Sequence, residues 1–350
     1  MPIDPIHLTR QLVDIESTTY HEAPAGEFLS TYLSGLGWEV ERQPVPQPDP
    51  ARTPGGGTGP RFNVYAACKD DKGKGIRPDV VLSTHMDTVP PFLGACREDA
   101  DFLYGRGTCD AKGIIAAQIA AAEKLRVARV KIGLLFVVGE ERDSAGAKVA
   151  NESPKGSRFL INGEPTDNRL AIASKGALRV ELYAHGRAAH SAYPELGESA
   201  IDKLLGALRD IQQLRLPIVE GIGDSTLNVG LIQGGRAPNV IADRAEAHLL
   251  VRLVDDGEAT KAAIVAAAAG RCEVDFTLKL PFVQMRAMPG FETMVAKFTT
   301  DIPALTAWGE PFLLGPGSIH VAHTPDERIA KHELLECVDL YVNLAKQLVG

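Results

Sequence analysis

The sequence predicts an α/β protein: a three-layer main domain with a mostly parallel sheet, and an inserted two-layer α+β sandwich. Two observations predict this class. In the first half of the chain, short apolar runs alternate with helical apolar spacing, which is typical of sheets with buried parallel strands. After about residue 169, longer strand-like runs flank two helical stretches, which indicates a separate module.

The elements of the main domain follow from these patterns in order. Helical spacing is expected over 8–15 and 25–36. The stretch 43–60 is rich in proline and glycine and is expected to be a surface loop, since these residues interrupt helices and central strands. The remaining elements expected before residue 166 are strands over 80–83, 132–138 and 158–161 and helices over 111–125 and 144–151.

The inserted module and the end of the chain complete the set. The module is expected to hold strands over 178–183, 226–232 and 245–254, and a fourth near 273–278. Two helices are expected over 200–214 and 259–269. The chain then ends with helical patterns near Met294 and over 330–348. The predicted boundaries are 1–173 with 289–350 for the main domain and 174–288 for the insertion.

Composition excludes several classes of protein. The 350 residues are 45% hydrophobic and 23% charged, the balance of a globular protein. The formal net charge of −8 and the absence of basic runs argue against nucleic-acid and anionic-membrane partners. The five cysteines are scattered, and the first residues lack the features of a signal peptide. Apolar runs are too short for a membrane span, so a cytoplasmic location is expected.

Three segments place polar residues where predicted strands end or a helix begins. LSTHMDTVP carries His85 and Asp87, which lie on the same side of an extended chain. YGRGTCDAKG places Asp110 at a helix start, and LLFVVGEERDSAG ends an apolar strand in Glu140 and Glu141. Each segment also has an interpretation without a functional role. His85 and Asp87 could form a surface pair, Asp110 could be a helix N-cap, and Glu140 and Glu141 could lie in a solvated loop. Adjacent carboxylates after a buried strand nevertheless favour a cation, with one as ligand and its neighbour as general base.

Two further segments complete the pattern. FLINGEPT supplies Glu164 after another short strand, and LLGPGSIHVAHTPDE supplies His320 and His323 before the last helix. Either histidine alone could be structural. Taken together, these segments can supply two histidines, one aspartate and two glutamates as ligands at the ends of strands in one sheet. This set has the number and types of ligands that two zinc ions sharing a bridging carboxylate require.

The segments HMDTVP, GRGTCDAKG, VVGEE, NGEPT and VAHTPDE resemble the cocatalytic-zinc exopeptidase and deacylase family, in the family's order over nearly the whole chain. The family includes acetylornithine deacetylase, succinyl-diaminopimelate desuccinylase, aminoacylase and glutamate carboxypeptidase. The resemblance implies a cis peptide bond after the bridging residue and no ligand role for His320. It implies one zinc on His85 and Glu164, another on Glu141 and His323, Asp110 as the bridge, Asp87 orienting His85, and Glu140 as the base.

The inserted module carries three more candidates through the same resemblance. His190 in YAHGRAAHSAYP takes the position that reaches the partner subunit's site in family members. Asn239 in QGGRAPNVI matches a substrate contact, and Arg252 in LLVRLV matches an arginine that holds a substrate carboxylate. In the absence of the resemblance, each would be interpreted as a turn or solvated strand residue. The module is therefore expected to form a homodimer and to cover the active site.

The expected reaction is metal-assisted hydrolysis of an amide bond. The main hypothesis is an N-acyl-amino-acid deacylase resembling acetylornithine deacetylase, with two Zn²⁺ ions or with Co²⁺ or Mn²⁺ instead. A carboxypeptidase or dipeptidase with the same site is the alternative, and a non-catalytic metal- or peptide-binding protein is the alternative of another class. Glu rather than Asp at position 164 resembles the deacylase and carboxypeptidase branches. The expected partner is a small N-acyl amino acid or a short peptide.

Overall fold

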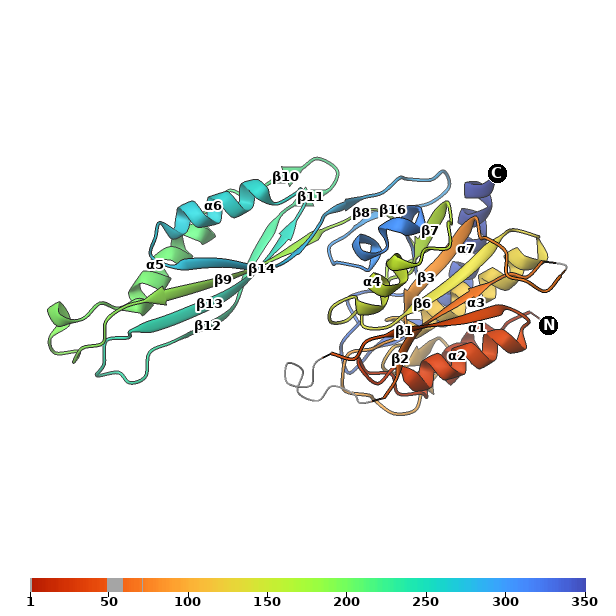
Figure 1. Cartoon of the computed structure of the whole chain (residues 1–350), viewed down its shortest axis with the longest axis horizontal. Helices are drawn as coiled ribbons and strands as arrows, with labels where there is room; N and C mark the ends of the chain where they lie inside the picture. Colours follow the sequence, from red (N-terminus) through yellow and green to blue (C-terminus); the bar gives the residue numbers. More distant parts are fainter. Residues whose placement is uncertain (1, 49–58, 71) are drawn as a thin grey trace. The chain divides into compact units, whose positions relative to one another are not determined.

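The computed structural model describes residues 2–48, 59–70 and 72–350, which form two compact units (Figure 1). The first unit contains Met1–Ile172, Met285–Met294 and Thr300–Gly350. The second contains Ala173–Gln284 and Val295–Thr299. The second unit thus interrupts the first in sequence.

The first unit is built on a large sheet whose strands follow the order β1-β2-β6-β3-β7-β17-β8-β15, with β16 also paired to β8. The central strands β6, β3, β7 and β17 are parallel, whereas the outer strands pair antiparallel. The predicted α/β class is confirmed. The strands are β1 (Glu39–Val45), β2 (Arg61–Ala67), β3 (Val80–His85), β6 (Ile132–Val137), β7 (Phe159–Asn162), β8 (Leu170–Ser174), β15 (Val283–Gln284), β16 (Thr293–Ala296) and β17 (Glu310–Leu313).

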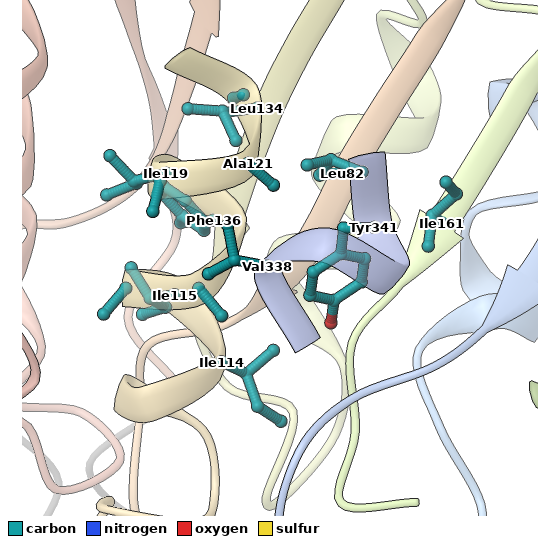
Figure 2. Close-up of a cluster of buried hydrophobic side chains, with 14 of the residues drawn as sticks. Leu82, Ile114, Ile115, Ile119, Ala121, Leu134, Phe136, Ile161, Val338 and Tyr341 are labelled. Carbon is teal, nitrogen blue, oxygen red and sulfur yellow. The ribbon is translucent and has the colours of Figure 1, made fainter. Parts of the chain in front are cut away.

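Helices pack on both faces of this sheet (Figure 1). Helix α3 is apolar nearly all round because it lies between the sheet and helices α1 and α7. Its residues Ile115 and Ile119 pack in one core with Leu82, Phe136 and Tyr341 (Figure 2). The helices are α1 (Pro5–Val13), α2 (Ala23–Gly35), α3 (Lys112–Val127), α4 (Ala145–Glu152) and α7 (Lys331–Val349), with short 3-10 turns at Ile302–Ala304 and Thr306–Trp308.

A small three-stranded sheet lies beside the loop that precedes α3. Its strands follow the order β18-β5-β4, and they come from the parts of the first unit that precede and follow the second unit in sequence. Strand β18 pairs antiparallel with β5, so the segment before α7 is joined to the segment before α3. The strands are β4 (Arg97–Glu98), β5 (Phe102–Tyr104) and β18 (Arg328–Ala330).

The second unit is an antiparallel sheet of order β12-β13-β9-β14 covered by α5 and α6. Strand β13 alternates buried and partly exposed residues, as expected for a sheet with one face on a core. Its elements are β9 (Gly176–His185), a 3-10 turn (Pro194–Leu196), α5 (Ala200–Gln212), β10 (Ile218–Val219), β11 (Gly223–Asp224), β12 (Thr226–Gly234), β13 (Arg244–Leu253), α6 (Glu258–Ala268) and β14 (Glu273–Leu280).

Two expectations about local structure are wrong. The helical pattern near Met294 is a strand, β16, because Thr293 and Val295 favour extended backbone and the segment pairs with β8. The loop expected over 43–60 does not begin at residue 43, because strand β1 extends to Val45 and includes Pro44. Proline is tolerated there because β1 is an edge strand. Residues 49–58 of that expected loop lie outside the described residues.

Candidate metal centre

The candidate site lies at the carboxyl ends of adjacent parallel strands. Strand β3 ends at His85, with Asp87 two residues later. The neighbouring strand β6 leads into Glu140 and Glu141, and β7, on the other side of β3, leads into Glu164. Loops at this edge of a parallel sheet commonly hold ligands and catalytic groups. The sheet order therefore brings together segments that are far apart in sequence.

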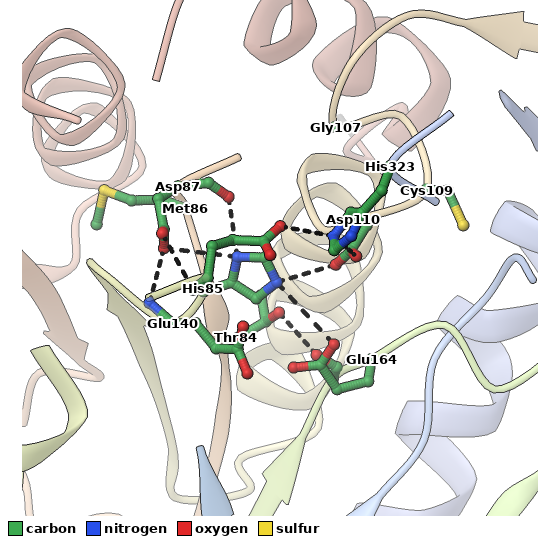
Figure 3. Close-up of polar contacts among 12 residues, drawn as sticks. Thr84, His85, Met86, Asp87, Gly107, Cys109, Asp110, Glu140, Glu164 and His323 are labelled. Atoms are coloured by element: carbon green, nitrogen blue, oxygen red, sulfur yellow. Dashed lines mark hydrogen bonds and ion pairs between the residues drawn. The ribbon is translucent and has the colours of Figure 1, made fainter. Parts of the chain in front are cut away.

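Asp110 lies between two groups of side chains. Its Oδ1 is 3.0 Å from Nε2 of His85, which is itself 4.0 Å from Oε2 of Glu164. Its Oδ2 is 3.3 Å from Nε2 of His323, which is 3.0 Å from Oε1 of Glu141. Figure 3 shows the side chains of His85, Asp110, Glu164 and His323 converging from separate elements. Each Asp110 oxygen thus faces a different histidine–glutamate pair.

The backbone around Asp110 has the conformation that the family resemblance implies. The Asp110–Ala111 peptide bond is cis, which confirms the sequence prediction. His323 has a φ of 63°, a left-handed conformation that non-glycine residues rarely adopt. Such conformations concentrate at functional sites, where the surrounding structure enforces them.

Asp87 connects the His85 strand to the Glu140–Glu141 loop. Its Oδ1 accepts hydrogen bonds from the main-chain N–H groups of Gly139 (2.9 Å) and Glu140 (3.1 Å), and its Oδ2 accepts one from Glu141 (3.3 Å). Nδ1 of His85 lies 2.9 Å from the main-chain oxygen of Asp87 and 3.6 Å from its Oδ1. Asp87 therefore holds the imidazole chiefly through its carbonyl, while its carboxylate fixes the glutamate loop.

The neighbouring glutamates have different surroundings. The Glu141 carboxylate contacts His323, as described above, whereas that of Glu140 forms no hydrogen bond or ion pair within the described part of the chain. Burial, followed by the negative charges of Glu164 and Asp301, raises the pKa of Glu140 well above its usual value. This arrangement allows Glu141 to act as a ligand and leaves Glu140 free to exchange a proton.

The pKa values reflect the crowding of charge. Burial lowers the pKa of His85, but hydrogen bonding to Asp110 and Asp87 more than offsets this, so the net shift is upward. The pKa of His323 rises to about 10, chiefly through its contacts with Asp110 and Glu141. Burial raises the pKa of Asp110, yet the two histidines lower it below its usual range. Without an ion, protonated histidines therefore neutralise the carboxylates.

The site has the chemistry of a divalent-cation centre. Glu164 is 4% exposed, and its Oε1 has no hydrogen-bond partner among the residues that the structure describes. Burial and the charge of Asp110 raise the Glu164 pKa, because an unneutralised carboxylate is costly there. Imidazole nitrogens and carboxylate oxygens form a donor set suited to zinc, cobalt or manganese. His85, Asp110 and Glu141 each offer a ligand atom within 4.8 Å of the others.

Of the three candidates on the insertion, two lie close together within the second unit, and Arg252 lies apart from them. His190 and Asn239 belong to facing loops, where His190 bridges to Val240 and Ser191 N–H donates to the Asn239 carbonyl. Arg252 lies near the other end of β13, opposite Ala177 of β9. Arg252 is partly buried and forms no hydrogen bond or ion pair with the residues that the structure describes, so its guanidinium is available to an anion.

Sequence reasoning missed several residues that support the site. The Thr19 hydroxyl donates to Oδ2 of Asp87 (2.9 Å), and the buried Arg61–Glu22 ion pair (2.7 Å) lies beside Gly139. Glu327 accepts hydrogen bonds from the Asp110 loop, and the buried carboxyl of Asp301 raises the pKa of Glu140. None of these residues has a local sequence signature, because their partners are distant in sequence.

Comparison with known proteins gives a consistent result. Residues 172–275 match the model of a peptidase dimerisation domain. A "Probable carboxypeptidase" of Aspergillus fumigatus is 37% identical over 96% of this chain and 84% of its own length. A "Peptidase M20 domain-containing protein" of Schizosaccharomyces pombe is 38% identical over 96% of this chain and 82% of its own length.

Solved structures share the fold at lower identity. Aminopeptidase PepT of Bacillus cereus has a TM-score of 0.78 at 21% identity, with 100% of both chains covered. A Bacillus subtilis protein described as a dinuclear metal binding peptidase of the M20 family has a TM-score of 0.68 at 17% identity, covering 97% of this chain and 96% of its own. The chain belongs to the M20 peptidase family. It is a metal-dependent hydrolase that acts on peptide bonds.

Proposed function

We propose that this chain is a dinuclear metallo-carboxypeptidase, which removes a C-terminal residue from a short peptide. The observation that carries the two-ion proposal is the position of Asp110, with each carboxylate oxygen against a different histidine–glutamate pair. The carboxypeptidase specificity is supported by the name of the Aspergillus relative and by Arg252, which has no ion-pair partner among the described residues.

The proposed ligands fall into two sets that share Asp110. His85 and Glu164 would hold one ion, and Glu141 and His323 the other. Two bound Zn²⁺, Co²⁺ or Mn²⁺ ions would supply a Lewis acid for the scissile carbonyl and lower the pKa of the attacking water. Asp87 orients His85 and keeps the Glu140–Glu141 loop in place through its hydrogen bonds to that loop's N–H groups.

Glu140 is the proposed general base. Its carboxylate takes a proton from the attacking water and then passes that proton to the amine that leaves. The raised pKa suits this exchange, because the group must hold the proton between the two steps. His190 of a second copy would donate its N–H to the oxygen on which negative charge develops, and Asn239 would contact the substrate. Arg252 would hold the substrate's terminal carboxylate.

An N-acyl-amino-acid deacylase, resembling acetylornithine deacetylase, is the second candidate. Glu164 favours it as much as it favours a carboxypeptidase, and both activities need a free carboxylate next to the cleaved amide. They differ in what lies on the acyl side of that bond: an acetyl group or a peptide.

Four substrates separate these activities when assayed with Zn²⁺, Co²⁺ or Mn²⁺. They are N-acetylornithine, a free dipeptide, an N-blocked dipeptide with a free carboxylate, and the same blocked dipeptide as its C-terminal amide. Preferred release of the last residue from the blocked acid, and not from the amide, supports the carboxypeptidase. Preference for N-acetylornithine identifies the deacylase. Preference for the free dipeptide identifies a dipeptidase, and binding without any cleavage supports the non-catalytic alternative.

The inserted module is proposed to form a homodimer. Edge strand β12 exposes Leu231 (39%) and Ile232 (54%), and an unpaired strand edge can pair with a second copy. The test mixes two inactive variants, Glu140→Ala and His190→Ala, after joint refolding. If His190 acts across the dimer, about a quarter of wild-type activity returns, because half of the dimers are mixed and each has one complete site. No recovery contradicts the proposal.

No helix in the described ranges combines the length and apolar character of a membrane span. The five cysteines are all free. A cytoplasmic location is in keeping with free cysteines and stays a prediction.

A further inference from the structure

Glu327 is placed against the Asp110 loop by strand pairing. Strand β18 begins at Arg328, which faces Tyr104 at the end of β5. The antiparallel register continues one residue beyond this pair, where Gly105 N–H donates to the Glu327 carbonyl at 3.0 Å. The start of the loop that leads to Asp110 is therefore hydrogen-bonded to the end of the short segment that follows His323.

The Glu327 carboxylate lies inside this loop. It is 1% exposed, and its Oε1 accepts main-chain hydrogen bonds from Gly107 (2.8 Å), Asp110 (3.2 Å) and Cys109 (3.3 Å). These three N–H groups have no other acceptor in the described residues. Buried N–H groups without a partner are costly, so this carboxylate defines the conformation of the loop.

Arg106 completes the connection. Its Nη1 lies 2.5 Å from Oε2 of Glu327 and donates to the Thr324 carbonyl at 3.2 Å. Thr324 directly follows His323 in sequence. One guanidinium thus links the segment that carries His323 to the loop that carries Asp110.

We propose that Glu327 is a positioning residue for the metal centre, which holds Asp110 and His323 in register with each other. This inference rests on the proposed two-ion function. Glu327 is not one of the proposed ligands, and it acts through the main-chain N–H groups of the Asp110 loop. Asp110 and His323, the residues that Glu327 positions, both belong to the ligand set that contains Glu141. The ligand set that contains His85 shares only Asp110 with them. Loss of Glu327 therefore weakens one ion site more than the other.

The test measures Co²⁺ binding by calorimetry and by visible absorption in wild type, Glu327→Ala and Glu327→Gln. Wild type is expected to bind two ions. In Glu327→Ala the affinity for one ion should fall by about 10- to 100-fold, the usual effect of removing a group that orients a ligand. Glu327→Gln retains an oxygen for the three N–H groups and should recover part of that loss.

A second variant separates positioning from general destabilisation. Leu33→Ala removes a fully buried side chain of α2, away from the proposed ligands, and should lower the Tm without changing either ion affinity. If Glu327→Ala lowers the Tm like this control and still binds both ions as wild type does, the inference is wrong. If wild type itself binds no divalent ion, the proposed function fails instead.

Discussion

The carboxylate Oε1 of Glu141 lies 3.0 Å from Nε2 of His323, although 182 residues separate them in the sequence. The whole of the second unit falls within that interval. The candidate site is thus assembled from segments on both sides of the insertion, and it forms only when the first unit's sheet has joined them. This geometry leads to four predictions.

The first prediction separates the two adjacent glutamates. Glu140→Gln removes the proposed base but no ligand, so it should bind two ions and lose about 10²- to 10⁴-fold in kcat. Glu141→Gln removes a charged ligand and should lose tight binding of one ion. Calorimetric stoichiometry and kcat, measured on both variants, check this. A Glu140→Gln enzyme with near-normal kcat would exclude the general-base role.

The second prediction concerns ion removal. An ion that binds only the folded state stabilises it, so a chelator should lower the Tm, and added Zn²⁺ or Co²⁺ should restore it. An ion at 100 times its Kd contributes about 2.7 kcal/mol to stability. Because the pKa of His323 is about 10 without an ion, this imidazole is protonated at neutral pH.

Ion binding must therefore displace a proton from His323, and affinity should rise with pH between about 6 and 10. Calorimetry in buffers of different ionisation enthalpy measures the number of protons released. An affinity that does not vary with pH over this range would contradict a ligand role for His323.

The third prediction concerns Asp301 in protein from which a chelator has removed the metal ions. Burial raises the Asp301 pKa from 3.8 to about 6, although smaller contributions from Ser144 and from the charge of His85 oppose the rise. The folded state then binds this proton more tightly than the unfolded state, so stability falls as pH rises from about 4 to 6. At pH 8 the ionised group costs about 3 kcal/mol, since one pKa unit corresponds to about 1.4 kcal/mol.

Asp301→Asn removes the ionisation, so it should stabilise the chelated protein at pH 8 and lose that advantage near pH 4. Urea unfolding of both forms at the two pH values measures the difference. An equal effect at pH 4 and pH 8 would mean that the Asp301 charge is not the cause.

The fourth prediction concerns Arg252. Its guanidinium is partly buried, and burial lowers its pKa, yet no protein carboxylate pairs with it in the described residues. Arg252→Gln should raise KM for substrates with a free carboxylate by roughly 10- to 100-fold, because hydrogen bonds to charged groups contribute about 1.5–3 kcal/mol. The exposed Arg179 on the neighbouring strand β9 provides the control Arg179→Gln, which should leave KM unchanged. An equal loss for the C-terminal amides would argue against carboxylate recognition.

The predictable parts of this protein are those with local signatures. Buried apolar runs identified β3, β6 and β7, and polar residues directly after them identified His85, the glutamate pair and Glu164. No local pattern predicts strands β1 and β2, because prolines and glycines surround them, and the apolar spacing near Met294 predicts a helix where the structure has β16. Its extended form depends on pairing with β8, which no local pattern records.

The supporting residues of the site were missed for a related reason. Glu327 directly precedes a three-residue strand and resembles any surface glutamate in sequence. Its role becomes visible only through hydrogen bonds to residues more than 200 positions away. Asp301 likewise follows an unremarkable Thr-Thr pair, and only the burial of its carboxyl distinguishes it.

The proline and the charged residues of β1 distinguish its free edge from that of β12. Strand β1 exposes Glu39, Glu41 and Arg42, and Pro44 removes a main-chain donor, so an approaching strand would meet ionic groups and an interrupted ladder. Strand β12 has no proline and no charged residue between Thr226 and Gly234. Of these two edges, we therefore expect β12, and not β1, to be the one at which a second copy of the chain would pair.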